Sequence, residues 1–107
     1  MTPSQTPAKA PRSPVPGQVS TELQRVVRRW QQLPLDHALS HAARLHALVQ
    51  ALADEVAKTT GVPAVEVPDC GPATLMDQLT VMVYDASAAE LTSTLALDLA
   101  GLRRDLS

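Results

Sequence analysis

The stretch LDHALSHAARLHALVQALADEV, residues 35–56, decides how this chain folds. Its apolar residues recur every three or four positions, the spacing that places side chains on one side of an α-helix. The stripe consists of Leu35, Ala38, Leu39, Ala42, Leu45, Val49, Leu52 and Val56. His41 and Leu48 widen it to nearly half of the helix circumference, which indicates packing against two or more neighbours. We therefore predict a central helix over about residues 35–59.

The ends of this central helix carry recognisable signals. Gly61 stands where a residue in the left-handed conformation would end it. At the other end, Asp36 fits the N-cap position, and Pro34 alternatively fits the first helical position. The residue before a proline is pushed out of the helical region, so Pro34 also separates this helix from the segment before it.

Three further segments carry similar apolar stripes, and we predict helices over about residues 20–32, 72–85 and 88–106. The first has capping-box spacing between Thr21 and Gln24, and the last has it between Ser87 and Glu90. The third starts at Gly71–Pro72, a pair typical of a helix N-terminus. The chain is thus predicted to be all-α, a small four-helix bundle.

Residues 79–84, LTVMVY, leave an alternative open because valine and tyrosine favour β-strands. Under that alternative, residues 79–84 pair as a hairpin with residues 62–67. The connector over residues 60–71 contains Pro63 and Pro68, which forbid a continuous helix or a central strand. Its valines suggest an extended segment laid over the core.

Composition also favours helices. The chain has 16 Ala, 15 Leu and 11 Val but no Ile, Phe or Asn, and Ala and Leu are strong helix formers. The missing residues have AT-rich codons, so we read the chain as bacterial, from a GC-rich genome. Five of the nine prolines fall within residues 1–18, which we predict to be a disordered, Pro-rich N-terminal tail. Residues 19–107 are the predicted helical domain.

Charge and cysteine usage narrow the classes of partner and compartment. The formal charge of −2 offers no global attraction to nucleic acid or anionic membrane. Cys70 is the single cysteine, so an internal disulfide is excluded and a reducing compartment fits. The N-terminus lacks the apolar core of a secretory signal, and no apolar run approaches the roughly 20 residues of a membrane span. We expect a cytoplasmic protein that does not bind membranes.

Two clusters of polar residues are candidate sites. Arg25, Arg28 and Arg29 form a cationic face opposite the apolar stripe of the first helix, which suits an acidic partner or nucleic acid. His37 and His41 are four residues apart on the central helix, a spacing that can hold one metal ion if other residues supply further ligands. The ordinary interpretation of both clusters is a solvated helix face, and we expect no metal and no cofactor.

Apolar residues outside the stripes point to protein contact. Val81 and Tyr84 lie on the back of the third helix, and Leu97 lies on the back of the fourth. Several such residues on different helices are typical of a surface that another chain covers. We therefore expect a non-enzymatic interaction or adaptor protein that binds a protein partner or forms a homodimer. A module that contacts nucleic acid through the arginine face, and a metal or ligand sensor that uses the two histidines, are the alternatives.

Overall fold

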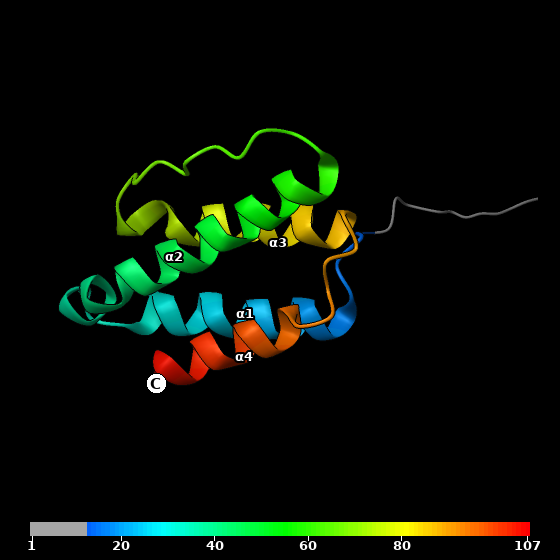
Figure 1. Ribbon diagram of the computed structural model, residues 1–107. Helices are drawn as coiled ribbons and strands as arrows, with labels where there is room; N and C mark the ends of the chain where they lie inside the picture. The colour runs from blue at the N-terminus through cyan, green and yellow to red at the C-terminus, as the bar shows by residue number, and fades with distance from the viewer. Residues whose placement is uncertain (1–12) are drawn as a thin grey trace, which may run out of the picture.

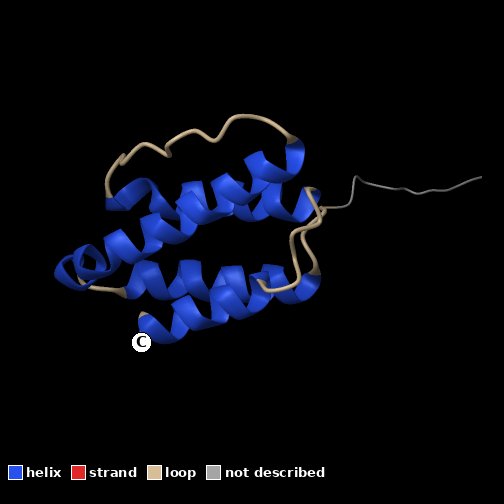
Figure 2. Cartoon of the chain, viewed as in Figure 1, coloured by secondary structure: helices blue, strands red, loops and turns tan. Residues whose placement is uncertain are grey.

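The computed structural model describes residues 13–107, and every regular element in that range is helical. The α-helices are α1 (Gly17–Gln32), α2 (Leu35–Thr60), α3 (Leu75–Ala88) and α4 (Leu95–Asp105), and a short 3₁₀ turn, η1 (Pro72–Thr74), precedes α3. The all-α, four-helix prediction is confirmed. Figures 1 and 2 show the helices as two pairs, α2 with α3 and α1 with α4, which face each other.

The core lies between the two pairs and is aliphatic, apart from Trp30. Each helix contributes residues at helical spacing, and the largest fully buried side chains are Leu45, Leu79, Leu95, Leu99, Leu102, Leu106, Val26, Val49 and Val83. Pairing of α1 with α4 brings the first and last helices of the described chain together. The fold therefore depends on contacts between its most distant segments.

The structure corrects the predicted start of α1. The helix begins at Gly17, three residues before Ser20, and the Ser20 amide donates to the carbonyl of Pro16 at 2.9 Å. Thr21 and Gln24 therefore lie inside the helix and do not cap it. The predicted disordered tail ran over residues 1–18; Gly17 and Gln18 of this range lie in α1, and residues 1–12 lie outside the described residues.

Helix α2 matches its prediction to one residue at its C-terminus. Gly61 has a φ of 76°, and the Val62 amide donates to the carbonyl of Ala57 at 3.0 Å, which closes the helix as expected. The helix begins at Leu35, as predicted, but the predicted cap was wrong, because Pro34 occupies the N-cap position and Asp36 lies within the first turn. Leu35 is exposed, so the buried stripe begins at Ala38. Leu39, which the stripe was predicted to include, is exposed as well.

Residues 79–84 are helical, and the β-hairpin alternative was wrong. A strand would place Leu79, Val81 and Val83 on the same face. Instead Leu79 and Val83 are fully buried while Val81 is 54% exposed, the pattern of a helix. The connector that would have formed the other strand runs along α2 and α3 without regular structure (Figure 2).

The largest correction concerns α4, which begins at Leu95 and not near residue 88. Ser87 is a buried residue of α3, and Glu90 has a φ of 63°, so Ser87 and Glu90 end a helix where a capping box was predicted to start one. The Glu90 amide donates to the carbonyl of Ser87 at 3.0 Å, and the Leu91 amide donates to that of Ala86 at 2.8 Å. These bonds form a Schellman ending.

Candidate functional site

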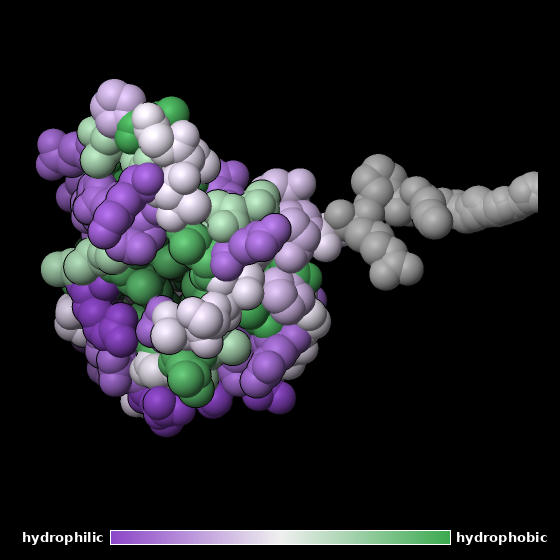
Figure 3. Space-filling view, turned by 45° about the vertical axis from the view of Figure 1, so that its right-hand side comes forward, coloured by the Kyte–Doolittle hydropathy of each residue, from purple (hydrophilic) through white to green (hydrophobic). Residues whose placement is uncertain are grey.

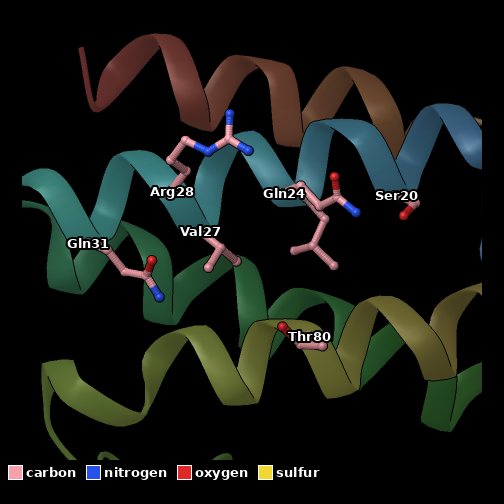
Figure 4. Close-up of a pocket in the computed structure, with 7 residues that line it drawn as sticks. Ser20, Gln24, Val27, Arg28, Gln31 and Thr80 are labelled. Atoms are coloured by element: carbon pink, nitrogen blue, oxygen red, sulfur yellow. The ribbon is translucent and has the colours of Figure 1, made fainter.

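The two helix pairs leave a groove of about 430 Å³ between α1 and α3. It is lined by Ser20, Leu23, Gln24, Val27, Arg28, Gln31 and Thr80. Figure 4 shows Val27 and Gln31 pointing from α1 toward α3, where Thr80 faces them. The residues of α1 recur at helical spacing because they form the edge between its buried stripe and its solvated face. The groove thus has an apolar floor and polar walls.

The charge of this groove comes from one side chain. Arg28 is exposed and forms its outer rim, with the guanidinium pointing away from Thr80 (Figure 4). No carboxylate lines the groove, and Arg28 has no ion-pair partner among residues 13–107. The remaining polar lining groups are neutral amides and hydroxyls, which can both donate and accept hydrogen bonds. An approaching negative charge therefore meets no repulsion from the lining.

The predicted face of Arg25, Arg28 and Arg29 is divided by the fold. The Nε atom of Arg29 donates to the carbonyl of Leu106 at 2.9 Å, so this arginine caps the C-terminal end of α4. Arg25 contacts Glu22 at 3.4 Å, and the other carboxylate oxygen of Glu22 accepts from Arg103 at 3.1 Å. Arg29 and Glu22 therefore join α1 to α4, and Arg28 remains as the member that faces an open surface.

Beside the groove, α3 presents a ridge to solvent. Val81 is 54% exposed and Tyr84 is 51% exposed, as expected from their place off the apolar stripe. Tyr84 lies one turn after Thr80, so it continues the α3 wall of the groove. Asp77 is also exposed, and Asp85 is half-buried. The ridge therefore combines two large apolar side chains with two carboxylates.

Leu97 is 72% exposed on α4, and it does not line the groove. A separate hollow lies between α2 and α4, where leucines form much of the lining and Glu55 and Asp98 contribute carboxylates. The space-filling view in Figure 3 shows apolar residues on the floor of a hollow between the two halves of the molecule. Leu97 thus lines neither hollow, whereas Val81 and Tyr84 lie on α3 within one turn of Thr80. Val81 also lines a smaller hollow between α3, α2 and the connector.

The structure places the predicted histidine pair on the surface of α2. His37 is exposed and His41 is half-buried. Within the described chain, no set of three or more histidine, cysteine, aspartate and glutamate side chains lies close enough to hold a metal ion. Cys70 is an exposed free thiol at the end of the connector. The geometry therefore does not assemble the ligands that a sensor using these histidines would need.

The connector over residues 61–71 is fastened by side chains that the sequence reading did not single out. The Gln50 amide donates to the carbonyl of Val65 at 3.2 Å, and its oxygen accepts from the Val67 amide at 2.7 Å. A ring nitrogen of His46 lies 3.0 Å from the carbonyl of Val67, and Gln78 donates to that of Pro68 at 3.0 Å. In the sequence, the only indication that these three side chains hold the connector is their position on two amphipathic helices.

Comparison of the chain with protein-family models, with curated proteins and with solved structures found no match. Within residues 13–107, every helix is too short or too polar to traverse a lipid bilayer. The groove and the α3 ridge themselves are therefore the features from which function is inferred.

Proposed function

We propose that this chain is a non-enzymatic interaction or adaptor protein, which acts by protein–protein contact through the groove between α1 and α3 and the adjoining α3 ridge. The observation that carries the proposal is the exposure of Val81 and Tyr84 on α3, within one turn of Thr80, the α3 residue that lines the groove. Half-exposed tyrosine and aliphatic side chains beside a hollow are typical of protein-binding surfaces. The exposed free thiol of Cys70 fits the reducing cytoplasm, where we place the protein.

The geometry favours this function over contact with nucleic acid. A nucleic-acid interface needs several free cations that follow a phosphate backbone. Arg29 is bound to the end of α4, and Arg25 lies against Glu22, so Arg28 is the free cation of the predicted face. By contrast, apolar side chains surrounded by amides and hydroxyls suit the side chains of another protein.

The test replaces Tyr84 with a photoreactive phenylalanine analogue in the full-length chain and irradiates living cells that express it. We expect a covalent adduct with protein at this position. The matched control carries the same analogue at Lys58, an exposed residue at the end of α2. Absence of any adduct at position 84, or equal labelling at both positions, would refute the proposed surface. An adduct that nuclease treatment removes would favour the nucleic-acid function.

A further inference from the structure

We propose that the groove between α1 and α3 is occupied by the α3 ridge of a second copy of this chain, in a symmetric dimer. This inference rests on the proposed function, because it names the partner of that same surface. Three features support it: the ridge, the groove and their position next to each other in one molecule.

The ridge has the chemistry of a helix that inserts into a groove. Asp77, Val81, Tyr84 and Ala88 are spaced by three or four residues, and all four are exposed, so they form one stripe along α3. Asp85 lies beside this stripe, one turn after Val81. A partner that receives the stripe must cover Val81 and Tyr84 and must meet the carboxylates with positive or neutral polar groups.

The groove offers that complement. Leu23 and Val27 supply an apolar floor, Arg28 supplies a positive rim, and no carboxylate lines the groove. From Ser20 to Gln31 the α1 wall spans roughly 16 Å at the helical rise, and the ridge from Asp77 to Ala88 spans the same length. Arg28 lies at the α1 edge of the groove with its guanidinium pointing away from Thr80 (Figure 4), so its long flexible side chain must turn toward the groove to meet the carboxylates of a docked ridge. Length, apolarity and charge therefore match.

Symmetry follows from the position of α3, which is both the wall of the groove and the bearer of the ridge. When the side chains of one copy's α3 ridge dock on the groove between α1 and α3 of another, the same contact forms in the opposite direction about a twofold axis. Such an interface is closed and saturates at two chains. The chain's own N-terminal segment suits the groove poorly, since residues 1–12 contain Lys9 and Arg12 but no carboxylate to meet Arg28.

A charge exchange tests this arrangement in the full-length chain. Light scattering after size exclusion should give a dimer for the wild type. R28E places a carboxylate near the two aspartates of the opposing ridge, and the double variant D77K/D85K places two ammonium groups near the arginine of the opposing groove. The dimer of each variant alone should therefore have a Kd at least about tenfold higher than that of the wild type. An equimolar mixture of the two variants should restore the dimer. In the mixed pair, one contact joins the introduced glutamate to the introduced lysines, and the other joins the original aspartates to the original arginine, so neither contact brings like charges together.

R104E is the matched control, because Arg104 is exposed on α4 outside the groove and should leave the dimer intact. Circular dichroism shows whether each variant keeps its helices. A wild type that stays monomeric at hundreds of micromolar, or variants whose mixture does not recover the dimer, would overturn the inference. A photoadduct of Tyr84 with a different protein would then leave the proposed function standing, whereas no adduct at all would remove both.

Discussion

Replacement of Gln50 by alanine should release the connector without unfolding the helices. The Gln50 amide binds the connector as a peptide group would, because it donates to the carbonyl of Val65 and accepts from the amide of Val67. This is the bonding that one residue makes to a parallel neighbouring strand. The connector is therefore fastened in part by one side chain of α2, and this side chain can be removed.

The magnitude follows from the two hydrogen bonds. The bond from the Val67 amide is half-buried and contributes about 0.5–1.5 kcal/mol, whereas the bond to the Val65 carbonyl is exposed and contributes less, so Gln50→Ala should lower the free energy of unfolding by about 1–2 kcal/mol. A third bond, from Gln50 to Asp54 at 2.9 Å, is exposed and adds little. Alanine is the stronger helix former, so the helix itself gains slightly. A measured loss therefore reports on the connector and not on α2.

Two measurements check the prediction. Urea unfolding followed by circular dichroism gives the free energy of unfolding, and hydrogen exchange gives the protection of the Val67 amide. Gln50→Ala should reduce that protection about tenfold, while amides in the middle of α2 keep theirs. Gln32→Ala, at the exposed end of α1 and outside the groove, is the control and should change neither quantity. Unchanged protection of Val67 in Gln50→Ala would show that the side-chain amide does not hold the connector.

Three further substitutions should change the free energy of unfolding measured in urea: two should lower it and one should raise it. Gly61→Ala should cost about 1–2 kcal/mol, because the φ of 76° penalises any Cβ atom, and no loss would contradict the left-handed ending of α2. Glu90→Gly should stabilise the protein by a few tenths to about 1 kcal/mol for the same reason, and a loss would show that the Glu90 side chain makes a contact worth more than the strain. Glu22→Ala should cost about 1 kcal/mol and less in high salt, because it removes the ion pair between α1 and α4; a loss that salt does not change would exclude a Coulombic origin.

The helices that sequence reading located well are those whose signals are local. The stripe of α2 repeats over many turns, and Gly61 ends it with a conformation that glycine adopts at low cost. The exposure of Val81 and Tyr84 followed from the same periodicity, since residues off the stripe face outward. Local spacing was therefore enough to predict the helices and the α3 ridge of the candidate site, but not the groove.

The start of α4 could not be read in this way because its signal has two meanings. A serine followed three residues later by glutamate fits a capping box, but Ser87 is small enough to be buried within α3. Leu91 then packs against the core from the loop, which requires the chain to turn at Glu90. Tertiary packing decides between the two meanings, and that packing is not encoded in the local pattern.

The groove and the division of the arginine face depend on which helices pair. Arg25, Arg28 and Arg29 are equivalent in the sequence, since all three lie opposite the apolar stripe of α1. Pairing of α1 with α4 brings the carbonyl of Leu106 to Arg29, although 77 residues separate them. The same pairing engages Glu22 with Arg103 and leaves Arg28 facing solvent beside α3. The charge available to a partner is thus set by helix order in space, so a substitution that loosens α4 should also change the charge of the groove.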